Sequence, residues 1–454
     1  MMVLAVSERG EPVSDREYWA SRAGFILATI GAAVGMGNIW RFSYVAGENG
    51  GGAFLLIYLL CVVVIGLPLV IAELAMGRRG AGDAVAAFAH GGRGWPWVGW
   101  ICIAGASVIL SYYAVIAGWA LKYFVGAATG SLWTATTAGF DGYFKQFIAN
   151  LGEPVAWQAA ILGTTMFIVA GGVQKGIEGW NRRLMPLLGL LLAGLAVYAL
   201  TLPNAGAGVR FLFAPDWSAF GRPGVWAAAM GQAFFSLGVG MAIFVTYGSY
   251  MPRTFSLPVA ATVVVAGDTL FAVVAGLAIF PGVFAFGVDP AAGPELAFIT
   301  LPQIFLEMPG GVFVGAIFFF LLSAAALTSM VSLLEVPVSM AMHRLRMSRW
   351  RATALFGTIV FVIGLPSAMS FGVLSHIRIG PYGILDAVDA AVSSYLLPVG
   401  GILIAVFVGW RVRRAETLRE ADFADDATGR GWLWLVRTVV PAAVFVVLLR
   451  NILG

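Results

Sequence analysis

Two apolar stretches of this sequence contain residues that could bind a charged ligand. Asp268 lies in the middle of VVVAGDTLFAVV, where a carboxylate is costly and usually serves a function. Asn38 ends the stretch GAAVGMGN, and Arg41 follows one helical turn later. A satisfied structural acid is the alternative reading of Asp268. The surrounding sequence must decide between a functional and a structural carboxylate.

Glycines break the same kind of segment at two places. Gly31, Gly35 and Gly37 lie together in one apolar run, and Gly238 and Gly240 interrupt another. Each glycine costs a helix interior about 1 kcal/mol relative to alanine. Unwound backbone at membrane depth offers carbonyls to a cation and helix N-termini to a carboxylate. Glycines also allow close helix packing, and spacing alone does not separate the two readings.

The composition indicates a membrane protein with many spans. The chain has 454 residues, of which 60% are hydrophobic and 11% charged, and its mean hydropathy is +0.89. A soluble domain cannot bury that much apolar surface. The net charge of +4 fits basic cytoplasmic loops better than nucleic-acid binding. Cys61 and Cys102 lie in apolar runs, so we expect packing residues rather than a disulfide, zinc or redox site.

Apolar runs long enough to span a bilayer recur along the chain, and no period-2 pattern suggests a barrel. We therefore predict an all-α polytopic fold, because helices satisfy their own backbone in lipid. The predicted spans are at about residues 19–46, 52–77, 96–125, 157–173, 184–202, 224–250, 257–286, 310–341, 352–370, 382–410 and 433–450.

Basic residues set the predicted orientation. Most of the 27 Lys and Arg residues fall on one side if the spans alternate, and we predict that side to be cytoplasmic. The N-terminus is then inside the cell and the C-terminus outside. We expect residues 411–430 to form a solvated loop. The stretch GPELAFITLPQIFLEM within 287–309 is too short to span and is predicted to form a helical lid on the outer face.

The broken spans occupy matching positions in two halves. Residues 19–202 would form a first repeat of helices 1–5, residues 224–410 a second repeat of helices 6–10, and residues 433–450 an added eleventh helix. Paired interruptions of this kind indicate a binding site between inverted repeats.

Longer motifs resemble one family closely. WASRAGFILATIGAAVGMGNIWRFSYVAGENGGGAFLL is similar to the first span of the neurotransmitter:sodium symporters, which have the LeuT fold. GLPLVIAELAMGRR, GQAFFSLGVGM, GDTLFAVVAG and AAALTSMVSLLEVP also match, and Gly176 and Pro186 fit the Gly-x9-Pro pattern of the family. The closest likeness is to eleven-span bacterial members that carry hydrophobic amino acids.

The resemblance implies two sodium sites and no chloride. One Na⁺ would be held by the Ala33 carbonyl, the side chains of Asn38 and Ser236, and the substrate carboxylate. Asp268 would replace chloride and contact this ion. The second site would consist of the carbonyls of Gly31, Val34 and Ala325 and the hydroxyls of Thr328 and Ser329. Without the resemblance, the two hydroxyls would be read as bonded back to their own helix.

The resemblance also implies a substrate pocket, with Tyr113 donating to the substrate carboxylate. Its residues would be Ala33, Met36, Gly37, Ile109, Tyr113, Ile116, Phe235, Ser236, Gly238, Met241, Ser329 and Leu333. None carries a charge, so a neutral hydrophobic or aromatic L-amino acid is expected.

Gates would close the pocket on both sides. Arg41 and Asp389 would pair on the outer side, supported by Gln232. Arg16 and Trp19 would form an inner latch, supported by Tyr250. The usual acidic partner of Arg16 is not evident. Glu73 and Glu335 are expected to be supporting or packing acids.

These features predict a sodium-coupled symporter of the bilayer that works by alternating access. A proton-coupled transporter and an amino-acid sensor of the same fold remain alternatives. An enzyme is not expected, because His90, His343 and His376 fall at separate loops or span ends. The sequence leaves the oligomeric state open.

Overall fold

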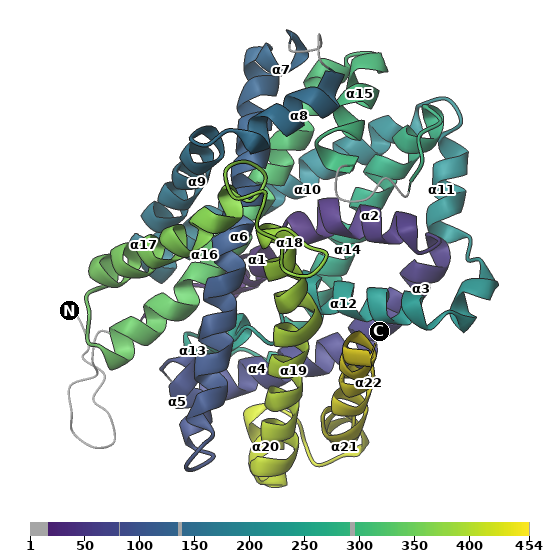
Figure 1. Cartoon of the computed structure of the whole chain (residues 1–454). Helices are drawn as coiled ribbons and strands as arrows, with labels where there is room; N and C mark the ends of the chain where they lie inside the picture. Colours follow the sequence, from purple (N-terminus) through teal and green to yellow (C-terminus); the bar gives the residue numbers. More distant parts are fainter. Residues whose placement is uncertain (1–16, 81, 135–138, 291–295, 454) are drawn as a thin grey trace.

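Helices make up the architecture in the computed structural model, which describes residues 17–80, 82–134, 139–290 and 296–453 (Figure 1). Nine continuous helices among these residues are long and apolar enough to cross a membrane, or ten if the bent first pair counts as one span. The described residues form no β-strand beyond two isolated bridges. The predicted all-α polytopic fold is confirmed.

The helices of the first half follow the predicted order. They are α1 (Arg22–Ala33), η1 (Gly37–Arg41), α2 (Phe42–Glu48), α3 (Gly52–Cys61), η2 (Val62–Gly66), α4 (Leu67–Gly80), α5 (Ala84–Ala89), α6 (Pro96–Thr129), α7 (Ser131–Thr134), α8 (Gly139–Ala149), α9 (Glu153–Ala170), η4 (Val173–Glu178) and α10 (Gly179–Leu200).

The second half and the final span contain the remaining helices. They are α11 (Ala205–Phe213), η5 (Trp217–Gly221), α12 (Pro223–Leu237), α13 (Ile243–Ser249), α14 (Leu257–Ala285), α15 (Thr300–Glu307), α16 (Gly311–Arg344), α17 (Arg349–Ala368), α18 (Ile384–Ala391), η7 (Val392–Leu396), α19 (Leu397–Val406), η8 (Phe407–Arg411), α20 (Arg414–Glu420), α21 (Ala427–Trp434), η9 (Leu435–Val439) and α22 (Val440–Leu453).

The first span is broken where the glycines cluster. Helix α1 begins at the Ser21 cap, whose hydroxyl accepts from the Gly24 amide at 2.9 Å. It ends at Ala33, and the chain resumes as a helix at Gly37 with a bend of 53°. The glycines therefore interrupt the helix rather than merely allowing close packing.

The sixth span is broken in the same way. Helices α12 and α13 have 15 and 7 residues, so neither crosses a bilayer alone. Between them, Gly238, Gly240 and Ala242 have positive φ values of 71°, 87° and 58°. Oε1 of the buried Glu73 on α4 accepts the Gly240 amide at 2.7 Å. This carboxylate satisfies backbone that the break leaves unpaired.

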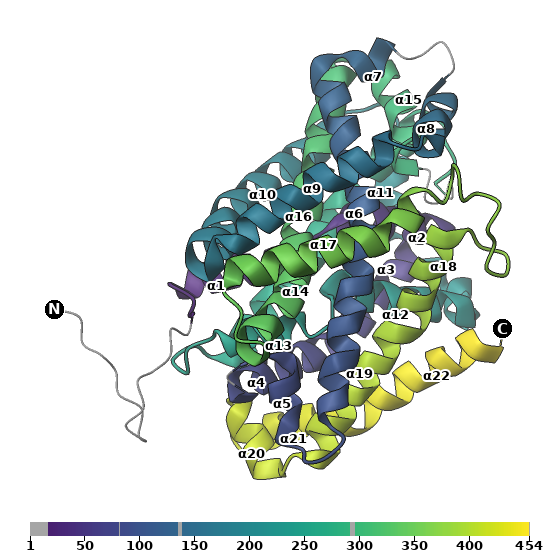
Figure 2. The ribbon, with the colours of Figure 1, turned by 60° about the vertical axis from the view of Figure 1, so that its left-hand side comes forward.

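Surface elements gather at two opposite ends of the bundle (Figures 1 and 2). Helices α7, α8 and α15 lie at one end, and α5, α20 and α21 lie at the other. We call these the outer and inner ends, following the predicted orientation. Helix α15 is part of the predicted lid and packs on α16, with Ile304 and Phe305 buried. Residues 293–295 of the lid lie outside the described residues.

The prediction of a solvated loop at 411–430 is wrong. This stretch contains α20, and Leu418 and Glu420 are buried. Arg78 at the end of α4 pairs with Asp422 at 2.6 Å and donates to the Glu420 carbonyl at 2.6 Å. Acidic residues that suggested solvent exposure, Glu416 and Asp422, instead pair with Arg79 and Arg78 and attach the segment to the inner end. Cys61 and Cys102 are buried free thiols, as predicted.

Gly240→Ala tests the break in the sixth span. A Cβ at Gly240 would lie 2.6 Å from the Leu397 carbonyl oxygen, at a φ that alanine rarely adopts. We expect the substitution to lower the free energy of unfolding by at least about 2 kcal/mol. The thermal midpoint of the purified protein in detergent measures this effect.

Gly231→Ala is the matched control, because Gly231 lies within α12 and a Cβ there meets nothing within 4 Å. We expect it to leave the midpoint unchanged or raise it slightly. Equal stability of the two variants would contradict the described backbone.

Candidate substrate and sodium sites

Asn38, Ser236 and Asp268 form one buried polar cluster. They come from η1, the last turn of α12 and the middle of α14, and each is at most 2% exposed. Nδ2 of Asn38 donates to Asp268 Oδ1 at 2.6 Å and to Ser236 Oγ at 3.1 Å. Ser236 Oγ donates to Asp268 Oδ2 at 2.9 Å. Two residues far apart in the sequence, Asn38 and Ser236, therefore donate to the carboxylate of a third, Asp268, beside the broken spans.

A second oxygen cluster lies where α1 ends against α16. Thr328 Oγ1 lies 3.2 Å from the Val34 carbonyl and 2.8 Å from the Ala325 carbonyl. Ser329 Oγ lies 3.4 Å and 3.3 Å from the carbonyls of Ala32 and Val34. Both hydroxyls thus bond across to the end of α1, and Thr328 also bonds back along its own helix. Gly31, Ala33 and Val34 lie at the end of α1, where helix carbonyls lose their usual partners.

A small pocket of about 30 Å³ lies between the two breaks. Of the predicted substrate residues, Ala33, Gly37, Ile109, Tyr113, Phe235, Gly238, Met241, Ser329 and Leu333 line it. Its lining also includes Ala32, Gly35 and Ile243, which were not among the predicted substrate residues. The other predicted substrate residues, Met36, Ile116 and Ser236, lie outside its lining.

Tyr113 contacts the first break directly. Its hydroxyl accepts from the Met36 amide at 3.0 Å, and a Cβ at Gly35 would lie 2.7 Å from the same oxygen. The hydroxyl also bonds to the side chain of Ser329. Tyr113 therefore supports the unwound backbone and presents a hydroxyl beside the pocket.

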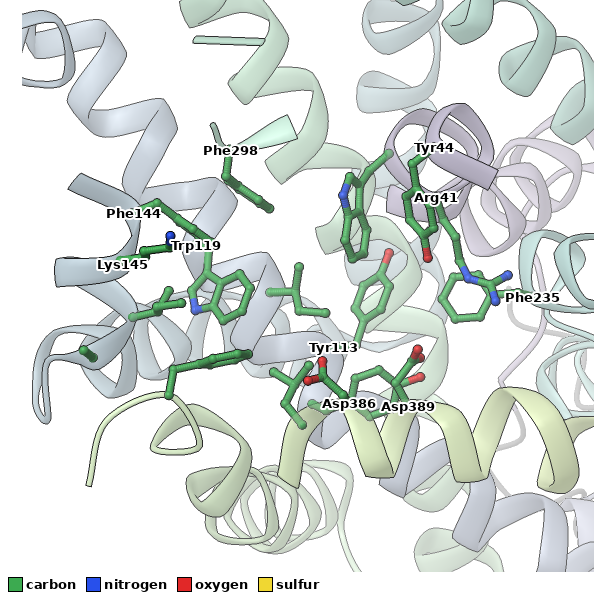
Figure 3. Close-up of a pocket in the computed structure, with 17 residues that line it drawn as sticks. Arg41, Tyr44, Tyr113, Trp119, Phe144, Lys145, Phe235, Phe298, Asp386 and Asp389 are labelled. Carbon is green, nitrogen blue, oxygen red and sulfur yellow. The ribbon is translucent and has the colours of Figure 1, made fainter. Parts of the chain in front are cut away.

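A larger cavity of about 620 Å³ adjoins the pocket on the outer side. Tyr113 and Phe235 line both spaces, and Ile116 lines only the outer one. Figure 3 shows Arg41 and Phe235 across this cavity from Asp386 and Asp389 on α18.

The two residues of the predicted outer gate, Arg41 and Asp389, do not form an ion pair in this structure. Arg41 donates to Gln232 Oε1 at 3.0 Å, and its guanidinium carbon is 4.5 Å from the centre of the Phe235 ring. None of the ion pairs among the described residues joins Arg41 to Asp389.

The inner side is closed by a network around Trp19. Its indole nitrogen donates to the Tyr247 carbonyl at 3.0 Å, and its amide donates to the Tyr250 carbonyl at 3.3 Å. The Tyr250 hydroxyl then donates to Glu335 at 2.6 Å. Glu335 is fully buried and pairs with Arg349 at 2.6 Å. Arg16 lies outside the described residues.

Sequence reasoning missed two members of this closure. Arg349, at the start of α17, pairs with both Glu335 and Glu17. In the sequence, Arg349 is one of several basic residues in HRLRMSRWR, a stretch between two predicted spans, and Glu17 adjoins the expected latch residue Arg16. An unpaired acid within an apolar span, Glu335, was the signal that a cationic partner should be sought.

Two interrupted spans that enclose polar groups at the centre of a helical bundle define a secondary transporter. A profile of the Sodium:neurotransmitter symporter family matches residues 16–141 and 133–453. The chain belongs to this family and is a sodium-dependent symporter of the membrane. The family consists of transporters rather than enzymes.

Known proteins match over nearly the whole chain. A crystal structure of MhsT in complex with L-phenylalanine matches with a TM-score of 0.90 and 50% identity, covering 96% of this chain and 100% of that one. The sodium-dependent transporter YhdH of Bacillus subtilis is 39% identical, covering 96% of this chain and 97% of its own length. A sodium-dependent transporter of Haemophilus influenzae is 33% identical, with 96% and 98% covered.

Arg349→Met tests the inner closure. The substitution leaves Glu335 buried without its cation, which costs about 3–5 kcal/mol, so the inner side should open more often. We expect a cysteine introduced at the buried Thr246 to react with a thiol reagent at least about a hundredfold faster in this variant. The labelling rate in proteoliposomes measures the change.

The double variant Arg349→Met with Glu335→Leu should restore slow labelling, because no buried charge is left unpaired. Arg414→Met, which removes an exposed ion pair with Asp425, should leave the rate unchanged. An unaltered rate in Arg349→Met would show that this network does not hold the inner side closed.

Proposed function

We propose that the protein imports a neutral hydrophobic L-amino acid together with Na⁺ and without chloride. The observation that carries this proposal is the position of the Asn38–Ser236–Asp268 cluster beside an apolar pocket whose lining has no charged side chain. Oxygen ligands in a low-dielectric site suit Na⁺, and an uncharged pocket suits an uncharged side chain.

The first sodium site would consist of the Ala33 carbonyl, Asn38, Ser236 and the substrate carboxylate. The Asn38 amide nitrogen faces Asp268 here, and its oxygen accepts from the Gly35 amide at 2.9 Å. Ligation through this oxygen therefore requires a local turn of the amide. Asp268 would supply the negative charge that chloride would otherwise provide.

The second sodium site would use the carbonyls of Gly31, Val34 and Ala325 and the hydroxyls of Thr328 and Ser329. Hydrogen bonds already draw both hydroxyls to the Val34 carbonyl. A sodium ion among these oxygens would join the end of α1 to α16. Binding of Na⁺ would thus order the first break before the substrate arrives.

The substrate would bind as a zwitterion between the two breaks. Its carboxylate would meet sodium and the Tyr113 hydroxyl, and its amine would meet free carbonyls of α1 and α12. Its side chain would lie among Ile109, Ile116, Phe235, Met241 and Leu333. The pocket of about 30 Å³ holds only about two waters, so binding must widen it. The adaptable Met241 side chain favours this adjustment.

Alternating access would then exchange the two closures. Arg41 and Asp389 would pair above the substrate, supported by Gln232, and the network around Trp19 and Tyr250 would open. Loosening between Gly176 and Pro186 would admit water to the second ion. The N-terminus would lie in the cytoplasm and the C-terminus outside. Phenylalanine bound to the similar MhsT supports this class of substrate.

A competition panel of the twenty amino acids tests the substrate. Labelled phenylalanine should accumulate in proteoliposomes only with a sodium gradient, and leucine, tryptophan and similar residues should compete. Lysine, arginine, aspartate and glutamate should compete at least about a hundredfold less well, because the pocket would bury their charges unpaired. Accumulation without sodium would favour proton coupling, and binding without accumulation would favour a sensor.

Asp268→Asn tests chloride independence. The variant keeps a polar side chain beside Asn38 and Ser236 but loses the fixed charge. We expect sodium-driven uptake in chloride-free buffer to fall at least about tenfold and to recover when chloride is added. Asp141→Asn on the exposed face of α8 serves as the control and should change nothing. Full uptake by Asp268→Asn without chloride would refute the assigned role.

A further inference from the structure

The side chain of Asn181 has an unused oxygen buried against the first span. Asn181 lies in α10 and is 2% exposed. Its Nδ2 donates to the Ile177 carbonyl at 2.9 Å. Because that acceptor requires an N–H group, the other atom of the amide is the oxygen. This Oδ1 has no hydrogen-bond partner.

The unused oxygen points at the end of α1. A Cβ added to Gly31 would lie 2.0 Å from Asn181 Oδ1, so the oxygen occupies the space where any other residue would place its side chain. Gly31 is one residue of the proposed second sodium site, and Met185 Sδ is the next neighbour of the same position. Asn181 therefore approaches α1 from α10, whereas Thr328 and Ser329 approach it from α16.

No described residue donates a hydrogen bond to this oxygen. Asn181 is the only polar residue among the buried residues of α10, all of which the structure describes. An acceptor in apolar surroundings beside free helix carbonyls can be satisfied by a cation or by water. Oxygen atoms that accept but do not donate are the ligands that a sodium ion needs.

A neighbouring contact shows that this interface continues toward the inner end. Glu178, one residue before α10, accepts from the Ala20 amide at 2.7 Å and from the Ser21 hydroxyl at 2.8 Å. Its Oε1 would lie 1.7 Å from a Cβ at Gly24. Pro186 lacks an amide hydrogen, so α10 is weakened just beyond Asn181. The side of α1 that faces α10 is thus lined with oxygens from the second sodium site toward the beginning of the span.

We propose that Asn181 Oδ1 ligates sodium in transit, as the ion leaves the second site along the interface of α1 and α10. The proposal rests on the second sodium site of the proposed function. It assigns Asn181 to the release route and not to the resting site, because the oxygen reaches α1 from α10, whereas the two hydroxyls of the resting site reach it from α16. Losing it should slow release while leaving equilibrium sodium binding nearly unchanged.

The test compares wild type with Asn181→Leu, which keeps the volume but removes the oxygen, and Asn181→Asp, which keeps an oxygen in place. Two quantities are measured with ²²Na⁺ and phenylalanine. One is the half-saturating sodium concentration for phenylalanine binding in detergent. The other is the initial rate of ²²Na⁺ accumulation in proteoliposomes, which requires release into the lumen.

We expect Asn181→Leu to accumulate ²²Na⁺ about tenfold more slowly, the effect of one lost polar contact, with half-saturation within about twofold of wild type. Asn181→Asp should stay within about threefold of the wild-type rate, because it retains the oxygen. Gln158→Leu is the control, since Gln158 is another fully buried amide without hydrogen-bond partners and faces α17 from α9. It should accumulate ²²Na⁺ at the wild-type rate.

A wild-type rate in Asn181→Leu would overturn this inference. So would equal slowing in Gln158→Leu, which would indicate a general loss of packing. A tenfold change in half-saturation would place Asn181 in the resting site and would also overturn it. Wild-type protein that binds phenylalanine without any need for sodium would instead overturn the proposed function and this inference together.

Discussion

The structure depends on one constraint: backbone that is unwound inside a membrane must find polar partners within the protein. The breaks in the first and sixth spans both satisfy this constraint. At the first, Asn38 accepts the Gly35 amide and Tyr113 accepts the Met36 amide. At the second, Glu73 accepts the Gly240 amide. The groups that stabilise the unwound backbone also line or adjoin the pocket. Stabilising the breaks and building a site for an ion and a zwitterion are therefore the same structural task.

The two sides of the pocket are held by different chemistry. On the inner side, the buried pair of Glu335 and Arg349 and the indole of Trp19 join segments from four parts of the chain. On the outer side, Arg41 is engaged by Gln232 and Phe235, and a cavity of about 620 Å³ separates the walls. A buried ion pair is costly to break by removing one partner, whereas Arg41 contacts only the neutral side chains of Gln232 and Phe235. This asymmetry explains why the structure is closed inside and open outside.

The sequence predicted those functional residues whose type is unusual for an apolar span. Asn38 and Asp268 are polar groups in apolar runs, and the glycine clusters marked both breaks. Ion pairs between distant segments could not be predicted in this way. No local sequence pattern links Arg349 to Glu17 or Arg78 to Asp422, because the residues of each pair lie far apart in the chain. Asn181 was missed because it lies in GIEGWNRR, which reads as a basic loop. The prediction for 411–430 failed for a related reason: Glu416, Glu420 and Asp422 pair with arginines from other parts of the chain, and the local sequence does not show this.

A crystal structure determined with Na⁺ and phenylalanine would test the central claim most directly. The account predicts an amino acid between residues 33–38 and 236–241, with its carboxylate touching a sodium ion that also contacts Asn38 and Ser236. Its side chain should lie beside Ile109 and Leu333, in a pocket wider than the one described. Continuous helices through both segments, or an amino acid bound elsewhere with no ion at its carboxylate, would contradict it.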